Sequence, residues 1–280
     1  MKRIMLVIII AGVIVGIVFG FIVAQSSRKP LGKPDNTSVI DPYPREILGQ
    51  SAQLSGKDLE EMKSWKQKVY NLARLYRGQF FLSGVASHKT VCLTFDDGPD
   101  PIVTPQVIDT LKNYNVRGSF FFIGERIRKY PNVVREAFHN EDLVLNHSFS
   151  HPRLDRVDRS RVKQEIMTTE QAIFDVIGKK PLLIRPPYGG IDSQVVEDVY
   201  NDGYRAVLWS VDTLDWTGKT PYEITQCVLD NVRPGDIILF HTNENRIATA
   251  QALPEIIYGL QQRGYHVIDL AQMLGTAAYQ

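Results

Sequence analysis

The sequence has few cysteines and no excess of charge. Two cysteines in 280 residues cannot form a disulfide framework, and we expect Cys92, at an alternating position of a strand-like segment, to be a buried free thiol. Lysine and arginine number 32 against 31 for aspartate and glutamate. The resulting net charge of +1 gives no reason to expect nucleic acid or another polyanion as a partner. The hydrophobic content of 44% suffices for one sizeable core without a second large domain.

Long apolar runs are also scarce, with one exception at the N-terminus. Residues 4–24 are apolar side chains and glycine without interruption, with basic residues on both sides. About 20 residues cross a bilayer, whereas the apolar part of a cleaved signal peptide has about 7 to 15. We therefore predict an uncleaved single-pass signal anchor over 4–24, with cleavage around Ala24 as the alternative. The basic residues on both sides leave the orientation open.

The next two segments differ in pattern. Residues 25–56 contain several prolines among polar residues, which predicts a flexible linker. Residues 57–88 are predicted to form one amphipathic helix, from Lys57 to Arg77, and a lead-in to the next domain. We expect the helix to pack on that domain, with a position on the membrane surface as the alternative. Its apolar positions, spaced by three and four, are Leu59, Met62, Trp65, Val69, Leu72 and Tyr76.

Short apolar runs alternate with helical patterns over residues 89–280. This alternation predicts an α/β domain of parallel strands, either a compact barrel or a doubly wound sheet. In both architectures functional groups gather at the carboxyl ends of the strands. The aromatic run "SFFFIG" is expected to pack in the core. The seven runs are "TVCLTF", "VRGSFFFIG", "DLVLNH", "PLLIRPP", "YRAVLWSVD", "GDIILF" and "YHVIDL".

Polar side chains follow these runs where each strand is expected to end. Five strand ends carrying aspartate, histidine or arginine are hard to explain by packing, so we expect them to converge on one site. The residues are Asp96, Asp97, His147, Arg185, Asp212, Asp215 and His241.

The residue types at these ends indicate metal chemistry. Asp97, His147 and His151 offer one carboxylate and two imidazoles, which are ligands of Zn²⁺ and similar divalent ions. Pro152 and the preceding strand place the two histidines in a loop or short turn. Two adjacent aspartates point in different directions, so one can bind the ion while the other accepts a proton from water. Arg185 could orient that base, and His241, with Asp215 as partner, could protonate the leaving amine.

Five ordered motifs, "TFDDGP", "HSFSHP", "RPPYG", "DTLDW" and "LFH", resemble those of the polysaccharide deacetylases, carbohydrate esterase family 4 or the NodB homology domain. The resemblance covers roughly residues 90–270. It implies a distorted (β/α) barrel, which we take as (β/α)7 preceded by the N-terminal transmembrane helix. It also implies metal-dependent removal of acetyl groups from N-acetylated sugars.

The resemblance assigns roles to individual residues. It implies that Asp96 is the base and His241 the acid, with Asp97, His147 and His151 as metal ligands. Arg185 would orient Asp96, and Asp215 would tune His241 or pair with Arg185. The backbone N–H of Tyr188 would stabilise the oxyanion of the intermediate. Trp216 and Leu239 would form the walls of the acetyl pocket.

These expectations define a membrane-anchored hydrolase with an extracytoplasmic catalytic domain. We expect a divalent cation, Zn²⁺ first, with Co²⁺ or Mn²⁺ as alternatives. The expected substrate is an N-acetylated polysaccharide, peptidoglycan N-acetylglucosamine first. Chitin oligomers, poly-N-acetylglucosamine and acetylxylan remain open, as does a silent glycan-binding protein. The sequence does not determine the oligomeric state.

Overall fold

A computed structural model describes residues 44–50, 54–85 and 88–280. The predicted anchor over 4–24 and most of the predicted linker lie outside these residues. Within the described part of the chain, no helix is long and apolar enough to cross a membrane. The described end of the predicted linker pairs with the domain. Leu48 forms a parallel bridge with Val211, because its N–H donates to Ser210 O at 2.8 Å and its carbonyl accepts from Asp212 N at 2.9 Å.

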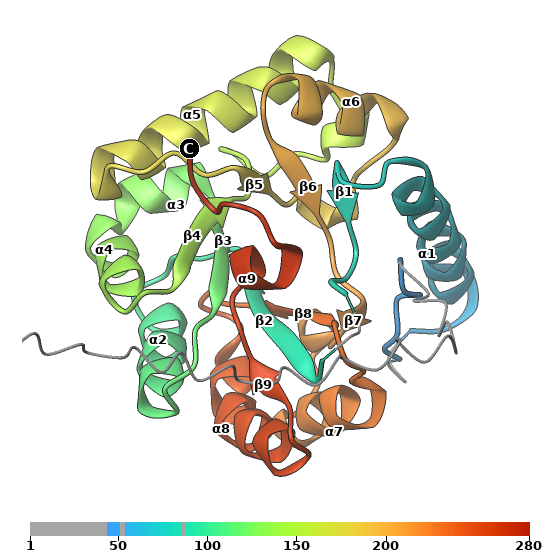
Figure 1. Ribbon diagram of the computed structural model, residues 1–280, viewed down its shortest axis with the longest axis vertical. Helices are drawn as coiled ribbons and strands as arrows, with labels where there is room; N and C mark the ends of the chain where they lie inside the picture. Colours follow the sequence, from blue (N-terminus) through green and yellow to red (C-terminus); the bar gives the residue numbers. More distant parts are fainter. Residues whose placement is uncertain (1–43, 51–53, 86–87) are drawn as a thin grey trace, which may run out of the picture. The chain divides into compact units, whose positions relative to one another are not determined.

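The centre of the fold is a curved sheet whose paired strands are parallel, seen in Figure 1 with helices around its outside. The strand order is β1-β6-β5-β4-β3-β2-β8-β7, and β9 pairs with β2. The end strands β1 and β7 do not pair with each other in the described residues, so the sheet is a half-barrel. The strands are β1 (Phe80–Phe81), β2 (Thr90–Asp96), β3 (Ser119–Phe122), β4 (Leu143–Asn146), β5 (Leu183–Ile184), β6 (Arg205–Val207), β7 (Val211–Asp212), β8 (Ile237–His241) and β9 (His266–Val267).

Helices cover the sheet and close one of its ends. At that end α9 lies over the starts of β2 and β3, where Leu270 N donates to Ser119 Oγ at 3.2 Å. The opposite end, where the strands finish, is therefore the one available for a site. The helices are α1 (Gly56–Leu75), α2 (Val103–Asn113), α3 (Gly124–Lys129), α4 (Pro131–His139), α5 (Arg159–Ile177), α6 (Ser193–Asn201), α7 (Pro221–Asn231), α8 (Ile247–Gln262) and α9 (Leu270–Leu274).

Successive side chains of β3 lie on opposite faces of the sheet and join two different core clusters. Phe120 and Phe122 pack between the sheet and the helices, where Phe120 stacks on Phe95 with ring centroids 5.0 Å apart. Phe121 points to the other face and joins the core cluster that contains Cys92. All of these side chains are fully buried, as expected for the aromatic run, and Cys92 is a buried free thiol as predicted.

The structure differs from the strand prediction in two places. Each of the seven apolar runs contains a strand, but "YRAVLWSVD" contains two, β6 and β7, separated by Leu208 to Ser210. Strand β1 was not predicted, because its two residues, Phe80 and Phe81, are too short a run to show alternation. The structure is an open α/β half-barrel of parallel strands, which is consistent with the expected distorted (β/α)7 barrel but has an extra short strand at its edge.

Helix α1 fills the segment predicted to be helical and packs against the domain. Its Val69, Leu72 and Ala73 are buried in the same core cluster as Phe80 and Ala206. At its C-terminal end, Tyr76 donates from Oη to Glu197 Oε1 at 2.6 Å. The apolar stripe therefore faces the sheet.

Candidate active site

A cleft of about 670 Å³ opens at the carboxyl ends of the strands. Arg185 and Asp215 lie behind its wall, and each bonds to a lining residue. The other predicted site residues all line the cleft: Asp96, Asp97, His147, His151, Tyr188, Trp216, Leu239 and His241. The structure thus brings together the strand-end residues that the sequence singled out.

Asp97, His147 and His151 form a cluster whose ligand atoms lie within 4.8 Å of one another. His151 Nε2 is 3.1 Å from Asp97 Oδ1, and His147 Nε2 is 3.6 Å from the same oxygen. The histidines lie in the loop after β4, as predicted. Burial alone would raise the pKa of Asp97, but the contacts with His147 and His151 hold it well below its usual range.

Neighbouring groups orient the cluster for a cation. His147 Nδ1 lies 2.7 Å from Arg185 O, and because a carbonyl only accepts, Nδ1 carries a proton, which leaves Nε2 as the nitrogen that could bind a cation. Asn243 donates to Asp97 Oδ2 at 3.1 Å, which leaves Oδ1 facing the histidines. Two imidazoles and one carboxylate are a ligand set of catalytic zinc sites with open positions. The residues present therefore fit a divalent cation.

Glu165 on α5 holds the loop that carries the two histidines. Its Oε2 accepts hydrogen bonds from Phe149 N and Ser150 N, each at 2.7 Å, and its Oε1 accepts from Ser150 Oγ. Glu165 is 1% exposed, so these bonds are shielded from water. Glu165 was not predicted as a site residue; the available signal was an acidic residue on the buried face of a helix.

Asp96, the last residue of β2, is fixed by a buried arginine. Its Oδ1 accepts from Arg185 Nη1 at 2.7 Å, while its Oδ2 lies 3.6 Å from His147 Nε2. Arg185 is fully buried and also donates to Thr94 Oγ1 at 2.9 Å and Leu208 O at 3.0 Å. The two adjacent aspartates therefore differ in environment: Asp97 contacts both histidines, whereas Asp96 is ion-paired and presents one oxygen to the cleft.

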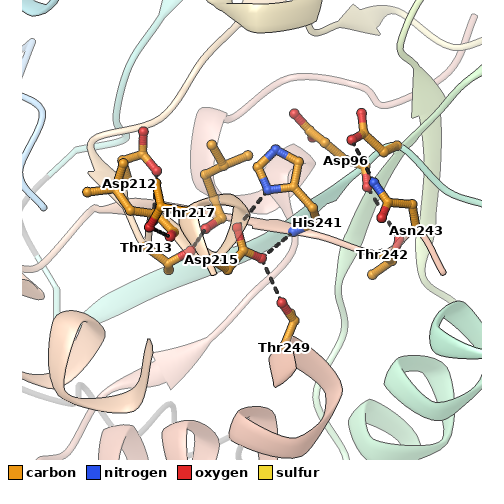
Figure 2. A network of polar contacts seen from close by, with 12 residues as sticks. Asp96, Asp212, Thr213, Asp215, Thr217, His241, Thr242, Asn243 and Thr249 are labelled. Carbon is orange, nitrogen blue, oxygen red and sulfur yellow. Dashed lines mark hydrogen bonds and ion pairs between the residues drawn. The ribbon is translucent and has the colours of Figure 1, made fainter. Parts of the chain in front are cut away.

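His241 and Asp215 form a second pair, shown in Figure 2. Asp215 Oδ1 lies 2.7 Å from His241 Nδ1, and its Oδ2 accepts from His241 N at 2.8 Å and Thr249 Oγ1 at 2.7 Å. Burial alone would lower the pKa of His241, but the charges of Asp215, Asp97 and Asp96 raise it to about 9. His241 is therefore an imidazolium at neutral pH, with Nε2–H available to the cleft.

The remaining predicted residues shape the cleft. Tyr188 lies in the short turn after β5; the residue is 62% exposed, and its ring centroid is 4.6 Å from that of His151. Trp216 is 39% exposed, and Leu239 is 2% exposed. Both line the cleft, as expected of walls around a small apolar group.

One wall of the cleft was not predicted as part of the site. Helix α1 contributes Asp58, Glu61, Met62 and Trp65 to the lining. The motifs gave no signal for this wall because all of them lie after residue 89. Asp212, named as a strand end without a role, also lines the cleft, where burial raises its pKa and its Oδ1 accepts from Leu214 N at 2.9 Å.

Comparison with known proteins agrees with this geometry. The family model described as polysaccharide deacetylase matches residues 83–207. A peptidoglycan-N-acetylglucosamine deacetylase of Bacillus cereus is 36% identical over 200 residues, which are 71% of this chain and 73% of the relative. The peptidoglycan-N-acetylmuramic acid deacetylase PdaC of Bacillus subtilis is 35% identical over 187 residues, but this chain spans only 39% of its length.

A solved structure extends the agreement to the fold. The crystal structure of the Bc1960 peptidoglycan N-acetylglucosamine deacetylase superposes with a TM-score of 0.72 at 35% identity, covering 75% of this chain and 99% of that one. Together with the family match and the Bacillus cereus relative, this shows that the chain belongs to the polysaccharide deacetylases of carbohydrate esterase family 4 and is a deacetylase hydrolase.

Proposed function

We propose that the protein removes N-acetyl groups from peptidoglycan N-acetylglucosamine in a metal-dependent reaction. One observation carries the chemistry: adjacent aspartates are divided between a two-histidine cluster and a buried arginine. The substrate rests on the relatives, since the Bacillus cereus protein and the superposed structure are both peptidoglycan N-acetylglucosamine deacetylases by name.

The proposed cation is held by Asp97, His147 and His151. A divalent ion there supplies Lewis acidity, which polarises the acetyl carbonyl and makes water a stronger acid. Zn²⁺ is the first choice because the ligand set combines two imidazole nitrogens with one carboxylate oxygen, and Co²⁺ and Mn²⁺ are the alternatives.

The side chains around the cluster then divide the proton transfers. Asp96, held by Arg185, takes a proton from the water that attacks the acetyl carbon. The N–H of Tyr188 donates to the oxygen that becomes negative in the tetrahedral intermediate. His241, charged through Asp215, gives its proton to the amide nitrogen as the C–N bond breaks. The products are acetate and a free amine, and Trp216 and Leu239 enclose the methyl group.

Acetate release from a panel of substrates tests this function. The panel contains peptidoglycan, chitin oligomers, poly-N-acetylglucosamine and acetylxylan. We expect the highest kcat/KM on peptidoglycan, with new amines on glucosamine after hydrolysis of the product. A higher kcat/KM on another glycan would contradict the proposed substrate. New amines on muramic acid would instead indicate the sugar named for the PdaC relative.

We also propose an extracytoplasmic location, with residues 4–24 as a membrane anchor. Its support is the length of this apolar run in the sequence and the extracytoplasmic position of peptidoglycan. A reporter that works only outside the cytoplasm should be active when it is fused after Gln280. Activity only in the cytoplasm would contradict the proposed orientation.

A further inference from the structure

The turn that carries Tyr188 has an unusual backbone. Tyr188 has φ 58° and ψ 15°, in the left-handed region, which residues with a side chain rarely adopt. Tyr188 as a whole is 62% exposed, so burial of this residue does not hold the conformation. Such a backbone persists only where its surroundings fix it. The contacts on either side of the turn therefore matter for where the N–H of Tyr188 points.

Trp65 of α1 makes the contact on one side. Its Nε1–H donates to Gly189 O at 3.0 Å, across 124 residues of sequence. Its ring packs closely against Gly189, because a Cβ added there would be 2.4 Å from Trp65 Cζ2. On the other side, a Cβ on Gly190 would be 2.7 Å from Asp155 Oδ1. The turn is thus held between an indole and a carboxylate, with no room for side chains on its glycines.

Trp65 is itself held by the body of the domain. Its ring packs on Trp209 with centroids 5.6 Å apart, and Trp209 is only 6% exposed. One and two turns further along α1, Val69 and Leu72 are buried in the core. This chain of contacts gives the indole a fixed position relative to the strands that carry Asp96 and His241.

We propose that Trp65 is a positioning residue that acts through Gly189 to aim the N–H of Tyr188 at the reacting acetyl group. This inference rests on the proposed function, in which that N–H stabilises the tetrahedral intermediate. The family match begins at residue 83, so Trp65, on the helix before it, lies outside the matched residues. Because Trp65 also lines the cleft, a direct contact with the glycan is the competing role.

The test uses the full-length protein with Trp65→Phe, which keeps an aromatic ring and removes the N–H donor. The matched control is Tyr76→Phe, which also removes one hydrogen bond between α1 and the domain, at Glu197 and outside the cleft lining. Steady-state kcat and KM for acetate release and the melting temperature are measured for each. Trp65→Ala, which also removes the ring packing, is measured alongside.

A positioning role predicts that Trp65→Phe lowers kcat about tenfold, a fraction of the 10²- to 10³-fold lost with a whole oxyanion donor, while KM stays within about twofold. Trp65→Ala should lose more, and Tyr76→Phe should keep the kcat of the wild type. A raised KM with unchanged kcat would assign Trp65 to glycan binding and overturn the proposal. Equal kcat losses in both phenylalanine variants, or none in either, would also overturn it. Failure of the proposed function is separate, because the wild type would then release no acetate.

Discussion

At the scale of single residues, the charge of His241, the proposed acid, depends on Asp215. Because the folded pKa of His241, about 9, lies above its ordinary 6.5, the pair stabilises the fold fully below about pH 6.5. That contribution is lost as the pH rises through about 9. In the proposed reaction, the same proton on His241 is the one given to the leaving amine. The pH ranges of the acid and of this stabilising pair are therefore linked.

Replacing Asp215 with asparagine should remove the charge that raises the pKa of His241. Burial, which lowers this pKa, is then opposed only by the charges of Asp97 and Asp96, so the pKa should fall below about 9 and the alkaline limb of kcat should move to lower pH. At pH 7 we expect a loss of roughly 10²-fold or more, the usual contribution of an acid. Thr249→Val, which removes one hydrogen bond and no charge, should shift the limb less. An alkaline limb that stays near pH 9 in Asp215→Asn would contradict the assignment of His241.

The convergence of the strand-end residues on one cleft was predictable, because polar side chains directly follow apolar runs in the sequence. Asp96, Asp97 and His241 follow apolar runs, so the rule for strand ends places them together. Trp65 was not predictable as a site residue, because its spacing within α1 is that of a core position and its partner, Gly189, is 124 residues away. Asn243, which bonds to Asp97, follows the same strand end as His241 and could have been found by the same rule.

At the scale of elements, β3 and β4 are joined by a buried acid. Asp142, just before β4, accepts from Gly118 N at 2.7 Å and from Asn140 Nδ2 at 3.1 Å. It is 1% exposed, and burial raises its pKa to about 7. The stabilisation from its protonated form is therefore complete below about pH 3.8 and is lost as the pH rises through about 7. Above that pH the fold holds a buried carboxylate.

Asp142→Asn should stabilise the protein at pH 8, because the amide oxygen can still accept from Gly118 while the buried charge is gone. We expect a gain in the free energy of unfolding of about 1 to 3 kcal/mol, which disappears near pH 4. The control is Glu141→Gln at the exposed neighbour, with a change within about 0.5 kcal/mol. Denaturant unfolding at both pH values measures this, and a loss of stability at pH 8 would show that the charge of Asp142 is needed.

The elements show where sequence patterns fail. The run "YRAVLWSVD" is mostly apolar throughout, yet its strand is interrupted at Leu208 to Ser210. Strand β6 before the break pairs with β1 and β5, whereas β7 after it pairs with β8 at the other end of the strand order. Hydrophobicity cannot show this break, because Leu208 and Trp209 are as buried as strand residues. Strand β1 is held by pairing with β6, a contact between residues more than 100 positions apart.

At the scale of the whole molecule, the half-barrel places its strand ends in one cleft and covers the other end with α9. The α/β class was predictable from the alternation of apolar runs with helical patterns. Whether the sheet closes into a barrel depends on its edge strands β1 and β7, which have only two residues each. Between the open edges, α1 packs against the domain and adds a wall to the cleft. In the proposed reaction, this one cleft contains both the metal site and a separate base.

The most direct test compares Asp96→Asn with Asp97→Asn in the full-length protein, measuring bound zinc by equilibrium dialysis and acetate release from peptidoglycan. Asp96→Asn should retain one zinc ion per chain and lose about 10²- to 10⁴-fold in kcat, as expected for removal of a base. Asp97→Asn should lose both zinc and activity. Zinc lost from Asp96→Asn and kept by Asp97→Asn would contradict the division of roles between the two aspartates.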